Sequence, residues 1–165
     1  MIEFKNNVED IRQRLSAVAD PEIPSVSILE MGIVRDVSKE GEVVTVTITP
    51  TYSGCPAMKL IELDIVSTLK NAGYPKVQVK TSYADAWTTE WISQSGRRKL
   101  KEIGITPPHS LSQIPLQIQL PEGKIECAVC NSTNTKLLSE FGSTACKSYY
   151  YCNDCMTTFE YFKSL

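Results

Sequence analysis

The sequence has 165 residues, of which 42% are hydrophobic and 22% charged, and its formal net charge is −2. This composition is typical of a globular protein large enough for one core and a small additional unit. The balance of charge argues against a surface that neutralises nucleic-acid phosphates. The basic run Arg97-Arg98-Lys99 with Lys101 is interpreted as a solvated helix face. Since we find neither an apolar leader nor a bilayer-length apolar run, we expect no membrane partner and a cytoplasmic location.

Helical and strand patterns alternate over the first hundred residues. Apolar spacing predicts helices over 8–18, 58–71 and 89–103, and strands over 33–37, 43–48 and 77–79. Prolines at 21 and 24 end the first helix, Pro56 begins the second, and Gly73 ends it. This order predicts an α+β domain at residues 1–104, with helices packed on one small sheet.

The composition changes at residue 105. Residues 105–123 carry several prolines and few charges, which predicts an extended linker. The remaining unit, 124–165, is too short to be stabilised by a hydrophobic core alone and therefore needs disulfide bonds or a structural metal. Strands are expected over 136–138, 149–151 and 157–162.

Two C-x-x-C pairs supply the ligands for such a metal: Cys127 with Cys130, and Cys152 with Cys155. Four thiolates at this spacing can surround one tetrahedral ion, which predicts a small β zinc-ribbon-like domain with a structural zinc. Four thiolates also suit iron or an iron–sulfur centre, so a redox tail stays open as an alternative. Zinc is favoured because Asn131 and Met156, not glycine, follow the second cysteine of each pair.

Cys146 lies between the two pairs and has no assigned role. It could be an additional metal ligand, replace one of the four, or be a half-buried thiol at a hairpin tip. The sequence leaves these readings open.

Cys55 stands apart from the other cysteines, in the stretch TPTYSGCPAM at residues 49–58. The turn leads from a strand into a helix, where unpaired amides and the helix dipole favour an anion. We therefore expect Cys55 to ionise readily as a nucleophile or soft-metal ligand. The alternative is a small buried apolar residue. Asp20 and Glu22 are candidates to converge on it, and two copies of Cys55 in a homodimer could share a cluster.

Three motifs resemble the domain of SufT-like iron–sulfur assembly factors: Asp20-Pro-Glu-Ile-Pro, Gly32-Ile-Val, and Thr51-x-x-x-Cys55-Pro. Trp87-Thr-Thr-Glu-Trp91, the segment 96–108, and Phe141-Gly-Ser-Thr-Ala-Cys-Lys147 are similar to the PaaD family. Members of that family are accessory proteins of the phenylacetyl-CoA epoxidase system in phenylacetate degradation. With the cysteine-rich tail, this resemblance spans nearly the whole chain.

The resemblance implies an accessory protein, not itself catalytic, that assists assembly of iron–sulfur or iron centres in the epoxidase. Its partners would be the oxygenase and iron–sulfur reductase subunits, and a transient iron–sulfur cluster would be handled at Cys55, Thr51 and Asp20. The alternative is a stoichiometric electron-transfer or structural subunit with a redox-active tail. An independent thiol enzyme is disfavoured, because the one histidine, His109, lies in the linker and completes no catalytic set.

Overall fold

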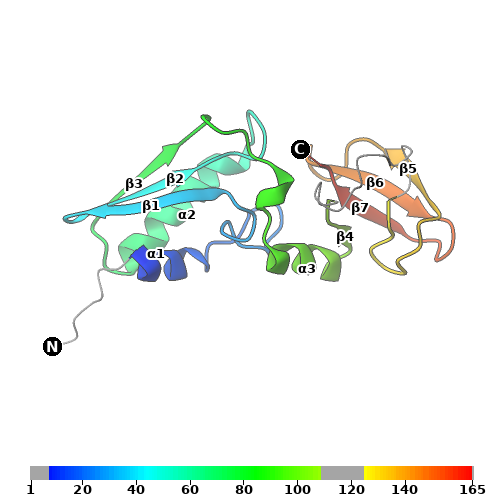
Figure 1. The fold of residues 1–165 in the computed structure, drawn as a ribbon, viewed down its shortest axis with the longest axis horizontal. Helices are drawn as coiled ribbons and strands as arrows, with labels where there is room; N and C mark the ends of the chain where they lie inside the picture. The colour runs from blue at the N-terminus through cyan, green and yellow to red at the C-terminus, as the bar shows by residue number, and fades with distance from the viewer. Residues whose placement is uncertain (1–7, 109–124, 165) are drawn as a thin grey trace. The chain divides into compact units, whose positions relative to one another are not determined.

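The computed structural model describes residues 8–108 and 125–164. Its contacts divide the chain into two compact units, residues 1–87 and 88–165. The predicted α+β fold class is confirmed, with a small sheet in each unit (Figure 1).

The first unit contains a three-stranded sheet in the order β1-β2-β3. Strand β1 (Val34–Glu40) pairs antiparallel with β2 (Val43–Ile48), and β3 (Lys76–Thr81) pairs parallel with β2. Parallel pairing requires a crossover, which α2 (Ala57–Asn71) supplies. Figure 1 shows α1 (Val8–Leu15) and α2 on the same side of this sheet.

The core lies between these helices and the sheet. Burying each large aliphatic side chain contributes about 2 kcal/mol, so this layer is the main source of stability in the unit. The fully or nearly fully buried residues are Ile11 and Leu15 on α1, Val44, Val46 and Ile48 on β2, and Ile61, Ile65 and Leu69 on α2. The helical spacing on α2 and the alternation on β2 confirm the predicted elements.

The first helix is shorter than the sequence pattern predicts. It ends at Leu15, and the chain turns before Ala19, which forms an isolated antiparallel bridge with Ser27. The Ser16 hydroxyl donates to the Gln13 carbonyl at 2.6 Å, a local bond that competes with helix continuation. Val18 is nevertheless buried, which explains why its spacing resembled a helix.

The helix predicted over 89–103 is divided into a 3₁₀ turn, η1 (Thr89–Trp91), and a helix, α3 (Gln94–Glu102). The division falls at Ser93, an N-cap whose hydroxyl accepts from the Gly96 amide at 3.0 Å. Trp87 precedes both elements, so it shares no helical face with Trp91. Its indole is 4% exposed and donates to the Met31 carbonyl at 2.9 Å, which is core packing.

Arg97 on α3 holds the backbone around this break. Its guanidinium donates to the carbonyls of Thr89 and Pro108, each at 2.5 Å, and to that of Ile92 at 3.3 Å. We expect Arg97→Ala to lower the free energy of unfolding by about 2 kcal/mol, because charged donors to several carbonyls are lost. Urea denaturation measures this. Arg98→Ala, which removes an exposed i,i+4 pair with Glu102, should change stability little; equal effects would contradict the assignment.

The second unit contains a four-stranded sheet in the order β4-β7-β6-β5. These strands are β4 (Ile105–Thr106), β5 (Thr135–Ser139), β6 (Lys147–Cys152) and β7 (Thr158–Phe162). Within the range expected for the linker, β4 pairs parallel with β7, and α3 contacts β4. Residues 109–123 of that range lie outside the described residues. The domain boundary at residue 104 stays a prediction.

Aromatic side chains compensate for the small size of this second core. Tyr150 stacks on Phe159 with ring centroids 5.9 Å apart and meets Tyr161 edge-on at the same distance. These rings pack with the buried cysteines Cys127 and Cys152. The two C-x-x-C turns are therefore anchored directly in the core of the unit.

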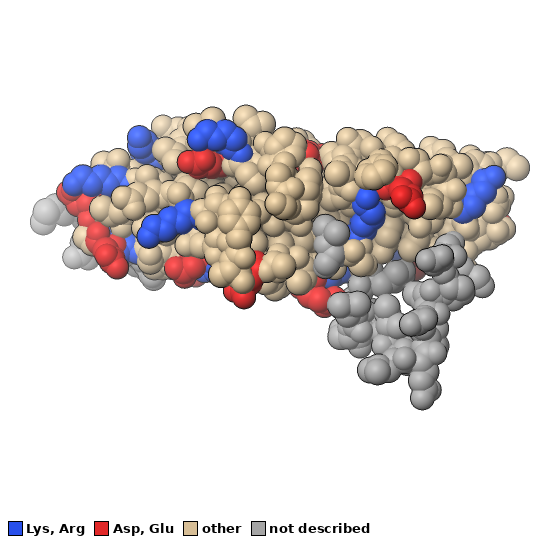
Figure 2. Space-filling view, turned by 90° about the horizontal axis from the view of Figure 1, so that it is seen from above, with Lys and Arg blue, Asp and Glu red and all other residues tan. Residues whose placement is uncertain are grey.

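The surface shows charges of both signs. Figure 2 shows basic and acidic side chains interspersed on the face in view, without a large basic patch. On α3, Arg98 pairs with Glu102, and Lys101 pairs with Glu126 at 2.9 Å, as expected for a solvated face. Within the described residues, no helix has the length and apolar content needed to cross a bilayer.

Candidate metal centre and thiol site

The four cysteines of the two C-x-x-C pairs converge at one end of the second sheet. Their sulfur atoms all lie within 4.8 Å of one another, with 3.7 Å between Cys127 and Cys155 and 3.5 Å between Cys130 and Cys152. A tetrahedral ion with metal–sulfur bonds of about 2.3 Å requires sulfur separations of about 3.8 Å. The donor set and its spacing therefore fit a four-coordinate metal such as zinc.

The backbone of both turns adopts the conformation that such a site needs. Asn131 and Met156, the residues after each second cysteine, have φ of 62° and 59°. The Asn131 amide donates to the Cys127 carbonyl at 2.9 Å, and the Val129 amide points at the Cys127 sulfur at 3.4 Å. A left-handed backbone conformation is costly for a residue such as methionine, so it persists only where the surrounding contacts fix it. The hydrogen bonds within each turn therefore hold the cysteine sulfurs in position.

A polar network ties the two turns together, and the sequence analysis did not identify it. The Asp154 carboxylate accepts hydrogen bonds from the Ser132 hydroxyl and from the Asn134 side-chain amide, the latter at 2.8 Å. These bonds lower the pKa of Asp154. The sequence does contain a signal for this network: Asp154 lies inside the second C-x-x-C pair, and Ser132 and Asn134 follow shortly after the first pair.

Four adjacent thiols require a cation before all of them can ionise. The Thr157 hydroxyl, 2.8 Å from the Cys155 sulfur, lowers the pKa of Cys155 to about 6. At Cys130 a backbone hydrogen bond from Ser132 acts in the same direction, but desolvation and the neighbouring thiols raise the pKa to about 12. Cys155 therefore loses its proton easily, whereas Cys130 keeps its proton. A bound divalent metal would supply the positive charge that allows the remaining thiols to ionise.

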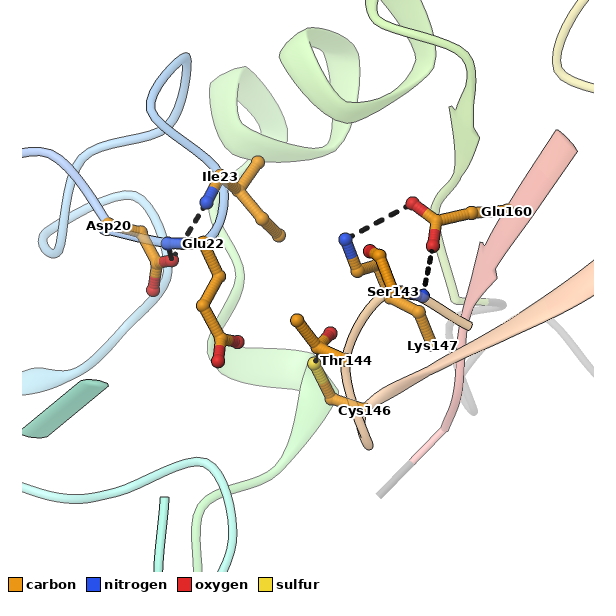
Figure 3. A network of polar contacts seen from close by, with 8 residues as sticks. All are labelled: Asp20, Glu22, Ile23, Ser143, Thr144, Cys146, Lys147 and Glu160. Carbon is orange, nitrogen blue, oxygen red and sulfur yellow. Dashed lines mark hydrogen bonds and ion pairs between the residues drawn. The ribbon is translucent and has the colours of Figure 1, made fainter. Parts of the chain in front are cut away.

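Cys146 is not part of this group. It precedes the first residue of β6, whereas Cys152 is the last, and a strand of six residues spans about 20 Å. The residue is 5% exposed, and its sulfur lies 3.0 Å from the Thr144 hydroxyl (Figure 3). The structure thus places Cys146 at the other end of the ribbon from the four clustered sulfurs.

The loop that carries Cys146 is closed by a buried ion pair that sequence reasoning missed. Lys147, whose side chain is 3% exposed, contacts the Glu160 carboxylate at 3.1 Å, and Glu160 also accepts from the Ser143 amide at 2.7 Å (Figure 3). A side chain at Gly142 would come within 2.8 Å of the Glu160 oxygen. A larger residue at position 142 would therefore have to displace the Glu160 carboxylate from its place beside Lys147.

We expect Glu160→Gln to destabilise the protein by about 3 kcal/mol, because it leaves Lys147 buried without a counter-charge. Burial by itself raises the pKa of Glu160. The hydrogen bonds from Ser143 and the contact with the charge of Lys147 outweigh burial and lower this pKa below its ordinary value. The contribution is therefore present above the unfolded pKa, about 4.5, and is lost as pH falls through the folded value. Urea denaturation of the wild type and of Glu160→Gln at a series of pH values measures this contribution. A variant with unchanged stability and unchanged acid sensitivity would contradict it.

Cys55 lies in the first unit, on the turn between β2 and α2. Gly54 has a φ of 84° and open space around its Cα, so glycine is needed for the left-handed turn and not for close approach. Pro56 is the N-cap of α2, with φ of −69°. The thiol is partly exposed, in contrast to the fully buried apolar residue that was the alternative.

The electrostatics of Cys55 differ from the sequence expectation. Desolvation raises the pKa of the thiol above its ordinary value, and the charges of Glu22 and Asp20 raise it further. Hydrogen bonds from the Ala57 amide and the Thr51 side chain act in the opposite direction but are outweighed. The raised pKa differs from the ready ionisation that we expected, because burial of the thiol and the charges of two carboxylates together outweigh the hydrogen bonds at the helix N-terminus.

Asp20 shapes the acidic loop beside Cys55. The residue is 6% exposed, and its carboxylate accepts hydrogen bonds from the amides of Glu22 at 2.8 Å and Ile23 at 3.0 Å (Figure 3). Thr51, Asp20 and Glu22 all act on the thiol, so the structure brings together the residues that the sequence associated with it. Among the described residues, however, only the four cysteines of the ribbon have ligand atoms close enough together to hold a metal ion, so Asp20 and Glu22 act on Cys55 through their charge.

Comparison with known proteins covers nearly the whole chain. Residues 8–81 match the family described as iron–sulfur cluster assembly protein, and residues 113–163 match the PaaD zinc beta ribbon domain. A protein of Escherichia coli K12, named as one subunit of a "Putative 1,2-phenylacetyl-CoA epoxidase", is 42% identical over 96% of this chain and 93% of its own length. The chain belongs to the PaaD family. The resemblance seen in the sequence motifs is confirmed.

The first unit has relatives outside that family. The "Fe-S protein maturation auxiliary factor" of Porphyromonas gingivalis is 33% identical over 59% of this chain and 94% of its own length. The crystal structure of domain of unknown function DUF59 from Bacillus anthracis has a TM-score of 0.52 and 29% identity, and covers 56% of this chain and 90% of its own. This PaaD family member therefore combines an assembly-type domain with a metal-binding ribbon.

Proposed function

We propose that this protein is an accessory factor of the phenylacetyl-CoA epoxidase system that handles iron or an iron–sulfur cluster during maturation of the enzyme. Cys55, with Thr51 and Asp20, receives or transfers the metal species as cargo. The ribbon holds a structural zinc and contacts the oxygenase or reductase subunits. The protein itself performs no epoxidation.

The partly exposed thiol of Cys55, just before the N-cap of α2 in an assembly-type domain, is the observation that carries this proposal. A thiol with a raised pKa suits temporary binding, because a metal must displace the proton and competing ligands can reverse the step. The proton leaves to solvent when the sulfur–metal bond forms. The identity to a relative named as part of an epoxidase supports the same pathway for this chain.

The chemistry of the ribbon supports a resident metal with a structural role. All four positions around the metal would be occupied by sulfur, which leaves no open site for substrate. Cys127 and Cys152 are 0% exposed and belong to the aromatic core. Cys130, Cys152, Cys127 and Cys155 would hold the ion, and its binding energy would fold the unit.

A second candidate function is an electron-transfer or structural subunit of the epoxidase. The observation that favours it is the same sulfur geometry, since four thiolates hold iron as readily as zinc. Cys130 is exposed, which would give an electron partner access to the centre.

Anaerobic purification with metal analysis and a visible spectrum distinguishes the two functions. We expect one zinc per chain, no colour, and uptake of iron or a cluster on reconstitution that is lost in Cys55→Ser. Iron bound equally by wild type and Cys55→Ser, with a reversible redox spectrum, would overturn the maturation role and assign function to the ribbon.

A further inference from the structure

Among the described elements of the first unit, α1 and α2 both pack on one side of the three-stranded sheet, and neither lies on its other face (Figure 1). Val44, Val46 and Ile48 of β2 face the helices and are buried. The alternate residues Val43, Thr45 and Thr47 are partly exposed and lie on the open face. This face is polar, and the charge pattern across it is ordered.

The strand register sets out that pattern in three rows. Cross-strand partners share a face of a sheet. The register gives the rows Asp36, Thr47, Lys80; Ser38, Thr45, Gln78; and Glu40, Val43, Lys76. In these rows the edge strand β1 presents two carboxylates, β2 presents β-branched residues, and the edge strand β3 presents two lysines. Arg35 is also exposed on β1, at the bulge directly before Asp36, and lies outside the register. Acidic and basic edges flank an uncharged centre.

We propose that this face binds the same face of a second copy of the chain, around a two-fold axis that runs parallel to the strands. Such an axis places each row of one copy opposite the same row of the other copy. It also places β1 of one copy opposite β3 of the other. Asp36 then faces the partner subunit's Lys80, and Glu40 faces the partner subunit's Lys76, each pair occurring twice. A two-fold axis across the strands would instead place carboxylates on carboxylates and lysines on lysines.

The Asp36 and Lys80 pair gives this arrangement its specificity. Both side chains are exposed, and within the described part of the chain neither forms an ion pair. Lys76 already contacts Glu42 at 2.9 Å, with both side chains more than half exposed, so it has less to gain from a partner. The partly exposed residues of β2, which are Val43, Thr45 and Thr47, lie on the two-fold axis. Each of them would therefore face the same residue of the partner subunit.

The size of the face predicts a weak dimer. Six residues of strand span about 20 Å and three strands about 10 Å, which is well below the area of a stable interface. Exposed charges dominate the contact, so the dimer should dissociate in salt. This inference does not depend on the proposed function.

Sedimentation velocity of the full chain, from micromolar to millimolar concentration and at low and high salt, tests it. We expect a concentration-dependent dimer at low salt. Asp36→Lys and Lys80→Asp should each weaken self-association by about tenfold or more, because each places like charges opposite one another twice. An equimolar mixture of the two variants should form a heterodimer, and the double variant should regain the homodimer.

Lys70→Glu is the matched control, since it makes a similar charge change on the exposed side of α2 and should leave the dimer unchanged. Circular dichroism establishes that each variant is folded. A wild type that stays monomeric at millimolar concentration and low salt would overturn the proposal and leave the face to a different protein. A dimer that survives every swap, or variants that do not rescue one another, would also overturn it.

Discussion

Replacing Cys127 or Cys155 by serine is expected to release the metal and unfold the second unit while the first stays folded. Each substitution breaks a set of four sulfurs within 4.8 Å of one another. Structural zinc in small domains contributes on the order of 10 kcal/mol of folding free energy, more than the aromatic core of this ribbon can replace. Metal content should fall from one ion per chain to almost none, and limited proteolysis should degrade residues beyond 125 selectively.

Cys146→Ser is the matched control for this result, because Cys146 is equally a buried cysteine of the same unit but lies apart from the four sulfurs. It should keep the metal and the protease resistance. A Cys127→Ser protein whose ribbon stays resistant would contradict the metal-dependent fold. Loss of metal in Cys146→Ser would instead make it an additional ligand in solution.

Replacing Cys55 by serine is expected to abolish support of epoxidase activity without changing the fold. The thiol is partly exposed and is not part of the buried core, so serine should cost little stability. Its sulfur is the soft ligand of the acidic site, and oxygen binds iron and clusters much less readily. A reconstituted or complementing system with this variant should show the activity obtained with no added protein.

Two further measurements distinguish this effect from misfolding. Thermal denaturation and zinc content should match the wild type. Ser53→Ala, an exposed change on the same turn, should retain full support of activity. Full activity with Cys55→Ser would show that the thiol is dispensable and would remove it from the proposed function.

Local sequence signals predicted most of the elements, because the relevant forces act over a few residues. The alternation in β2 and the spacing of Ile61, Ile65 and Leu69 in α2 directly reflect burial on one face. The break at Ser93 was missed, since an N-cap serine inside a helical pattern is apparent only when its hydroxyl is seen to accept the Gly96 amide. The early end of α1 was missed because Val18 is buried although it lies outside the helix.

Long-range contacts account for the site features that sequence reasoning did not find. The Lys147 and Glu160 pair joins residues 13 apart on neighbouring strands, and nothing in either local pattern indicates burial of a charge. The pKa of Cys55 depends on carboxylates more than thirty residues away in the chain. The helix N-terminus is visible in the sequence, whereas the burial of the thiol and the strength of the opposing charges depend on the tertiary fold.

The sequence by itself determined the family, the α+β class and the candidate metal ligands, because motifs and C-x-x-C spacing are local chemistry. Only the tertiary structure decided which sulfurs meet, that Cys146 stands apart from them, and that burial and two carboxylates raise the pKa of Cys55. It also ordered the charges on the open sheet face, since strand register and solvation depend on residues that are distant in the chain.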